Sequence, residues 1–250
     1  MGASDDAEKK CRTLEAWLQE NGVTWATDAM AFTAQDVVGG MGVVSKRAIR
    51  PGEVLANIPK SAALSIRNTS ASKLIEDNGL DLDAALRVAI ATEVALGARS
   101  RWHGYFKSFI KPFEDLPYLW SPEQRALLAG TDAEGTVEET LADLQSEYRE
   151  VVLPLLDSPP LNDVDISLED YLRAATLATS RAFTVDDFHL EALVPLADAF
   201  NHRCQKVPAG ETVREISSPD EAVQRPAASR RRTPPFAPWQ GPVPPMQPGR

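Results

Sequence analysis

Hydrophobic positions change their spacing along the first 206 residues, and the change separates helical from strand-like stretches. In residues 7–20 apolar side chains recur at helical spacing, and Asn21-Gly22 ends the segment. In residues 37–66 short apolar pieces alternate with turn residues, which predicts a run of short strands. The pieces are Val37-Val38, Val43-Val44, Val54-Leu55 and Ala63-Leu64, separated by Gly39-Gly40, Pro51-Gly52 and Pro59.

Helical patterns dominate from about residue 75 onward. One apolar stripe at helical spacing ends at Gly97, and its members are Leu82, Ala85, Leu86, Ala89, Ile90 and Val94. Three further segments begin with residues typical of helix N-termini. These are Ser121-Pro122-Glu123-Gln124, Thr136 with Glu139, and Ser167 with Asp170. We interpret most stripe positions as core, and the pattern as a whole predicts an α+β protein.

The composition changes abruptly near Lys206. Residues 207–250 contain ten of the nineteen prolines, and proline lacks the amide donor that helices and sheets need. We therefore expect a disordered Pro/Arg-rich C-terminal tail over these residues. It is either a ligand for a proline-recognising domain or an unstructured or aberrantly translated end, and we favour the second interpretation.

The charge balance restricts the class of function. A net charge of −10 argues against nucleic-acid binding, which relies on cationic neutralisation of phosphates. The tail has six arginines, no lysine and four acidic residues, hence +2, so the rest of the chain carries −12. An acidic body suits a basic protein substrate, although acidity also serves solubility alone.

Segments that direct a chain to a membrane or a secretory route are not evident. No run approaches the roughly 18 apolar residues that a membrane span requires, and residues 1–10 lack an apolar signal region. Two cysteines, Cys11 and Cys204, are too few and too far apart for a disulfide framework. We expect an intracellular monomer without membrane contact, and the sequence leaves cytoplasm, nucleus and plastid open.

Two short motifs contain residues suited to ligand contact. Gly40, Met41 and Gly42 follow Gly39 in a turn between predicted strands, and glycine lets a backbone approach a ligand closely. Taken alone, however, most such turns are only hairpins. Arg181 ends an apolar helix in Ser180-Arg181-Ala182-Phe183, where the helix dipole by itself favours a cation.

A third motif places Asp198, Asn201 and His202 directly behind an apolar run. Their amide, imidazole and carboxylate groups are suited to orienting a polar ligand. A capped turn with surface polar groups explains the motif equally well. His202 and Cys204 lie close in sequence, but no further ligand completes a zinc set, so we expect no metal site.

Taken in order, these pieces resemble one family, the SET-domain methyltransferases of the Rubisco large-subunit lysine methyltransferase-like group. The resemblance covers roughly residues 12–204, and four motifs in the same order make it specific. The motifs are GGMGVVSKRAIRPGEVLANIPKSAALS (39–65), PYLWSPEQRALLAGT (117–131), SRAF (180–183) and LVPLADAFNH (193–202).

The resemblance implies a SET-domain β-fold of short strands, split by a helical insert over about residues 75–180. It implies a protein-lysine N-methyltransferase that uses S-adenosyl-L-methionine, with a protein substrate whose acceptor is lysine or possibly histidine. The residues it implies for the cofactor site are Gly40, Met41, Gly42, Arg181, Asp198, Asn201 and His202.

One departure from the family pattern concerns the catalytic group. In this group a strand with the active-site tyrosine follows the Asn-His motif, whereas the last tyrosine here is Tyr171. We therefore assign no catalytic residue, and we expect residues 1–206 to hold an incomplete SET domain followed by the tail. Two other functions remain open, a non-catalytic protein-interaction module and an inactive truncated product.

Overall fold

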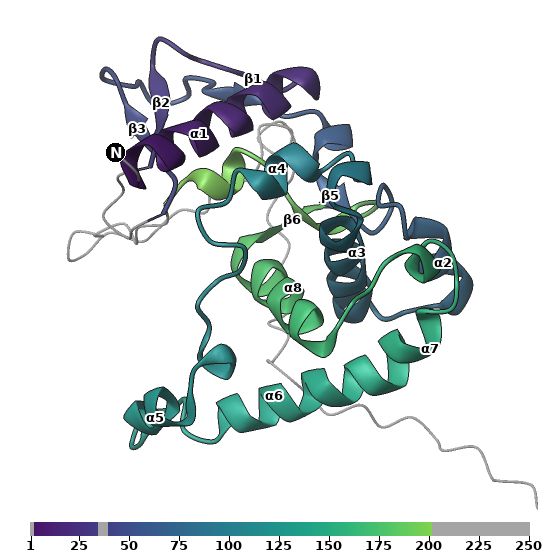
Figure 1. Ribbon diagram of the computed structural model, residues 1–250. Helices are drawn as coiled ribbons and strands as arrows, with labels where there is room; N and C mark the ends of the chain where they lie inside the picture. The colour runs from purple at the N-terminus through teal and green to yellow at the C-terminus, as the bar shows by residue number, and fades with distance from the viewer. Residues whose placement is uncertain (1–2, 35–39, 202–250) are drawn as a thin grey trace, which may run out of the picture. The chain divides into compact units, whose positions relative to one another are not determined.

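Residues 3–34 and 40–201 are described by the computed structural model, and they fold into short strands and helices (Figure 1). The strands are β1 (Thr24–Trp25), β2 (Met30–Thr33), β3 (Gly42–Ser45), β4 (Ala56–Asn57), β5 (Leu64–Ser65), β6 (Ala182–Asp186) and β7 (Leu190–Leu193). The helices are α1 (Ala3–Glu20), α2 (Ser72–Asn78), α3 (Leu82–Leu96), α4 (His103–Lys107), α5 (Pro122–Arg125), α6 (Thr136–Glu147), α7 (Leu153–Leu155) and α8 (Leu168–Arg181). This mixture confirms the α+β prediction.

The strands pair in three small antiparallel sheets. β1 pairs with β4, β2 pairs with β3, and β7 lies between β5 and β6. In the third sheet Leu64 faces Leu193 and Ser65 faces Ala192, so strands from distant parts of the chain meet. This pairing places the two segments that flank the helical region side by side.

The helices α2 to α8 all lie between β5 and β6 in the sequence. α3 packs against α8 near the three-stranded sheet. α6 lies crosswise on the side of α8 away from that sheet, with α5 at one end and α7 at the other (Figure 1). Apolar side chains from α1, α3, α4, α8 and the strands form the main core, and Trp102, Tyr105, Tyr171, Leu18, Met30 and Leu64 are among its largest fully buried members. A smaller cluster with Tyr118, Val137, Leu144 and Leu172 joins α6 to α8.

α1 and α4 approach each other closely at a glycine. A Cβ atom added to Gly104 would lie 2.7 Å from Cδ1 of Trp17. The Trp17 indole is buried and donates a hydrogen bond of 2.8 Å to the carbonyl of Arg101. Glycine at residue 104 is therefore required by the close approach of the two helices.

Helix α3 contains a buried carboxylate. Glu93 is 1% exposed. Its oxygens accept hydrogen bonds from the Thr69 hydroxyl (3.0 Å), the Ser70 amide (2.6 Å) and the Ser100 hydroxyl (2.5 Å). Because three donors satisfy it, the carboxylate ties α3 to the segments that precede α2 and α4.

Several sequence predictions are confirmed for individual helices and for one strand. Ser121 with Gln124 and Ser167 with Asp170 form capping boxes at the starts of α5 and α8. Residues 7–20 belong to α1, and Val43-Val44 belong to β3.

Other predictions are wrong in detail. Thr136 is the first residue of α6 and not its cap, since Gly135 holds that position with φ 84° and makes no side-chain cap. Val54-Leu55 lie just before β4. The core prediction holds for most of the α3 stripe, since Ala85, Leu86, Ala89 and Ile90 are buried, whereas Leu82 and Val94 are 55% and 44% exposed. The predicted Val37-Val38 strand and the tail at 207–250 lie outside the described residues.

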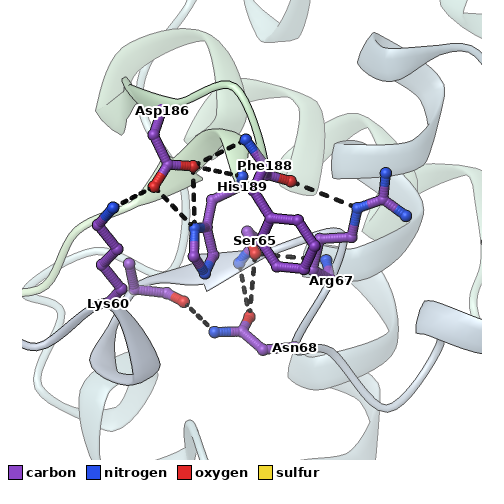
Figure 2. Close-up of polar contacts among 8 residues, drawn as sticks. Lys60, Ser65, Arg67, Asn68, Asp186, Phe188 and His189 are labelled. Atoms are coloured by element: carbon purple, nitrogen blue, oxygen red, sulfur yellow. Dashed lines mark hydrogen bonds and ion pairs between the residues drawn. The ribbon is translucent and has the colours of Figure 1, made fainter.

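The β6–β7 turn is held by polar contacts around one carboxylate, as Figure 2 shows. Asp186 accepts hydrogen bonds from the backbone amides of Phe188 (3.0 Å) and His189 (2.6 Å). It also pairs with the ammonium of Lys60, and the His189 ring nitrogen Nδ1 lies 3.0 Å from it. These donors, the His189 amide foremost, hold the pKa of Asp186 well below its ordinary value.

The depressed pKa predicts how stability depends on pH at this turn. The stabilisation from Asp186 is present above the unfolded-state pKa near 3.8 and is lost as the pH falls below it toward the folded-state pKa. We expect Asp186→Asn to lower the urea midpoint at pH 7, with the difference from the unmodified chain shrinking progressively below about pH 4. A constant difference between pH 7 and pH 3 would contradict this assignment.

Candidate functional site

A pocket of about 440 Å³ is lined by residues from six segments of the chain. They are α1, residues 40–41, α4, residues 108–116, the end of α8 and residues 198–201. The volume of the pocket is in the range of small-molecule sites. Five of the seven predicted site residues line it, and they are Gly40, Met41, Arg181, Asp198 and Asn201. Gly42 is buried at the start of β3 and is not part of the lining, and His202 lies outside the described residues.

Arg181 is the last residue of α8, and three groups fix its guanidinium. Nε donates to Glu114 Oε1 at 2.6 Å, and Nη1 donates to Asp198 Oδ2 at 3.0 Å. The guanidinium carbon lies 4.5 Å from the ring centroid of Phe109. The helix dipole favours a cation at this end, but these contacts also direct the side chain into the pocket.

Asp198 is the most deeply buried charged group of the site. Its side chain is 3% exposed, and Oδ2 accepts from the Tyr105 hydroxyl at 2.6 Å in addition to Arg181. The alternative of a capped turn with surface polar groups is therefore wrong for Asp198. The preceding turn contains Leu196 with φ 78° and ψ −48°, a sparsely populated conformation that costs a non-glycine residue roughly 1–3 kcal/mol. The fold accepts this strain where the carboxylate enters the pocket.

Burial and neighbouring charges together shift the pKa values of this cluster. Burial raises the pKa of the Asp198 carboxyl above its ordinary value, while the Arg181 guanidinium and the Tyr105 hydroxyl counteract part of that rise. Burial, with the charge of Asp198, also raises the pKa of the Tyr105 phenol well above its usual range. Burial opposes the charge on Arg181, but the carboxylates of Asp198 and Glu114 outweigh it and raise its pKa. Arg181 therefore stays cationic at neutral pH.

The rest of the lining combines apolar side chains, open backbone and polar side chains, the last being Ser108, Lys111, Asp115 and Ser180. Leu14, Met41, Phe109 and Leu116 contribute apolar surface. A Cβ atom added to Gly40 would meet no described atom within 4 Å, so the space above this residue is open. The pocket can thus hold a molecule with both an apolar part and a charged polar end.

Sequence reasoning missed Tyr105 and Glu114. Tyr105 belongs to α4, and Glu114 lies in the loop after it, 67 residues before its partner Arg181. No local pattern distinguishes this glutamate from a solvent-exposed one. Only the tertiary fold brings Tyr105 to Asp198, 93 residues away, and Glu114 to Arg181, 67 residues away.

The described residues contain neither a metal-binding cluster nor a membrane-spanning helix. Across 3–34 and 40–201, no group of three or more His, Cys, Asp or Glu side chains is arranged to hold a metal ion. Within those same ranges, no helix has the length and apolar character needed to cross a membrane.

Comparison with known proteins gives related sequences although no family model matches the chain. The chain is 29% identical over 216 residues to N-lysine methyltransferase SETD6 of Bos taurus, covering 80% of this chain and 48% of that protein. It is 32% identical over 194 residues to N-lysine methyltransferase SETD6 of Mus musculus (69% and 40%). It is 29% identical over 202 residues to ribosomal lysine N-methyltransferase 3 of Saccharomyces cerevisiae (70% and 36%). The chain thus spans less than half the length of these relatives.

Solved structures share the fold. The SET domain of LSMT bound to lysine and AdoHcy superposes with a TM-score of 0.66 at 23% identity, over 82% of this chain and 45% of that one. Rubisco LSMT bound to sinefungin and monomethyllysine gives a TM-score of 0.65 at 23% identity (82% and 46%). By sequence and by fold, the chain is a relative of the SET-domain lysine methyltransferases of the Rubisco large-subunit methyltransferase-like group.

Proposed function

We propose that the pocket binds S-adenosyl-L-methionine and that the chain serves protein-lysine N-methylation. The observation that carries the proposal is convergence, because five residues chosen from three separate motifs line one pocket. Their chemistry fits the molecule. The guanidinium of Arg181 matches a carboxylate, the apolar lining matches a purine ring, and the open backbone at Gly40 allows close approach.

Methyl transfer requires mainly that the enzyme align the attacking amine with the methyl group. The cofactor, when bound, would supply an activated methyl group. Displacement by an amine is accelerated when the site holds the amine nitrogen in line with that methyl group. The amine must be neutral, although its ordinary pKa is about 10.4, so burial in the site must favour the uncharged form. Arg181 and Asp198 would orient the charged end of the cofactor, and Asn201 offers an amide for its polar groups.

The amine-orienting tyrosine has no assigned counterpart. Tyr171 is the last tyrosine in the sequence, and its hydroxyl bonds Glu147 away from the pocket lining. We propose that residues 1–206 hold the SET-domain portion, with the helical insert over about 75–180, and that 207–250 form a separate tail. The acceptor is a protein lysine or possibly a histidine, and a monomeric intracellular protein is our working assignment.

Calorimetric titration with S-adenosylmethionine tests the cofactor site. We expect saturable one-to-one binding, weakened at least about tenfold by Arg181→Ala because a charge-assisted hydrogen bond is lost. Arg149→Ala removes an exposed arginine that bonds only the backbone carbonyl of Gln145 among the described residues, and it serves as the matched control. No binding by the folded chain, or equal affinity in Arg181→Ala, would contradict the proposal.

Transfer of a labelled methyl group tests the second half of the proposal. The expected acceptors are lysine-containing peptides, since the chain is acidic. Cofactor binding without transfer to any of them would favour the alternative, a non-catalytic protein-interaction module.

A further inference from the structure

Arg181 already has two carboxylate partners inside the pocket. Its Nε atom donates a hydrogen bond to the Glu114 carboxylate, and its Nη1 atom donates one to the Asp198 carboxylate. A guanidinium that is partly buried requires such counter-ions, because an uncompensated charge away from water is costly. A ligand carboxylate that docks on Arg181 therefore meets a cation whose charge is already neutralised.

The two carboxylates differ in how firmly they are held. Asp198 is 3% exposed and its Oδ2 atom accepts from both Tyr105 and Arg181. Glu114 is 30% exposed, and among the described residues its carboxylate bonds Arg181 alone. Its backbone amide is fixed, since it donates to the Thr176 hydroxyl at 3.0 Å. The Glu114 side chain can therefore swing away while its backbone stays in place.

We propose that Glu114 is the displaceable counter-ion of Arg181 and that it sets the affinity of the pocket for ligands with a carboxylate. This inference rests on the proposed function, because it takes the carboxylate end of S-adenosylmethionine to dock on Arg181. The incoming carboxylate replaces the Glu114 carboxylate at Nε, whereas Asp198 stays and keeps the guanidinium oriented. Glu114 is thus an affinity-determining residue that weakens binding by competition.

The competition affects donor and product alike. S-adenosylhomocysteine carries the same carboxylate, so Glu114 lowers its affinity too. A resident carboxylate beside Arg181 then assists release of the product, since the empty pocket is already stabilised by the ion pair.

Calorimetry with two ligands and matched variants tests the role of Glu114. The ligands are S-adenosylmethionine and its decarboxylated analogue, which keeps the adenosine, sulfonium and amine. In Glu114→Gln the amide oxygen can still accept from Arg181, but the competing charge is gone. We expect S-adenosylmethionine to bind about three- to tenfold more tightly and the analogue to bind as before. Glu114→Ala should give the same direction.

Asp115→Asn removes an equal charge one residue away, where the carboxylate accepts from Trp120 Nε1 instead of from Arg181. A smaller change in this variant separates local competition from a general loss of negative charge. Weaker binding of S-adenosylmethionine to Glu114→Gln, or equal tightening of both ligands, overturns the role of Glu114 while leaving the proposed function intact. No binding of either ligand to any of the folded proteins overturns both.

Discussion

Glu93→Ala is expected to lower the free energy of unfolding by about 2–4 kcal/mol, because buried donors lose their acceptor and a small void remains. Thr69 and Ser100 are both 5% exposed, so water does not easily replace the carboxylate. The Ser100 hydroxyl also accepts from the Trp102 amide at 3.0 Å, which couples the loss to the start of α4. Urea unfolding followed by tryptophan fluorescence measures the change.

Glu93→Gln is the matched control for this prediction. Its amide oxygen can accept from Thr69 and Ser70, and its amide nitrogen can donate to the Ser100 hydroxyl once that hydroxyl rotates. We expect a loss of about 1 kcal/mol. If alanine and glutamine cost the same, the hydrogen bonds at Glu93 do not account for its burial.

Gly104→Val is expected to destabilise the protein by about 3 kcal/mol through overpacking. The new Cβ would lie 2.7, 3.0 and 3.1 Å from three atoms of Trp17, so the indole must move. A shift of the indole weakens the hydrogen bond from Trp17 Nε1 to the Arg101 carbonyl and separates α1 from α4. The urea midpoint should therefore fall, with the change visible in the fluorescence of Trp17.

A double-variant comparison isolates the clash. In a Trp17→Leu background the side chain facing Gly104 is smaller, so Gly104→Val should cost clearly less than in the unmodified chain. Additive effects of the two changes would show that valine acts through the helix backbone and not through Trp17.

The fold was predictable from sequence where a local rule determines an element. Ser121 and Ser167 start helices because a serine followed three residues later by a side-chain acceptor can satisfy the first free amides. The strands were harder, since β1, β4 and β5 each contain only two residues and depend on a partner elsewhere in the chain. This dependence explains why Val54-Leu55 were placed in a strand that begins one residue later.

The residues of the site likewise fall into those that a local motif identifies and those that only the fold brings together. Arg181 and Asp198 belong to short motifs, so their candidacy was visible without a structure. Tyr105 precedes Asp198 by 93 residues, and its hydroxyl meets that carboxylate only when α4 packs beside the Leu193–Asn201 segment. A residue such as Tyr105, which contacts the site through another side chain, belongs to no motif that a single sequence reveals.

The β5–β7–β6 sheet also constrains the order of assembly. Its central strand β7 ends at Leu193, which pairs with Leu64, and the helices α2 to α8 lie between them. The helices can form from local contacts as the chain leaves the ribosome, whereas the sheet must wait until its last strand has been made. Closing this long loop is expected to be the slow step, and until it occurs Leu64 and Ser65 lack the backbone partners that β7 supplies.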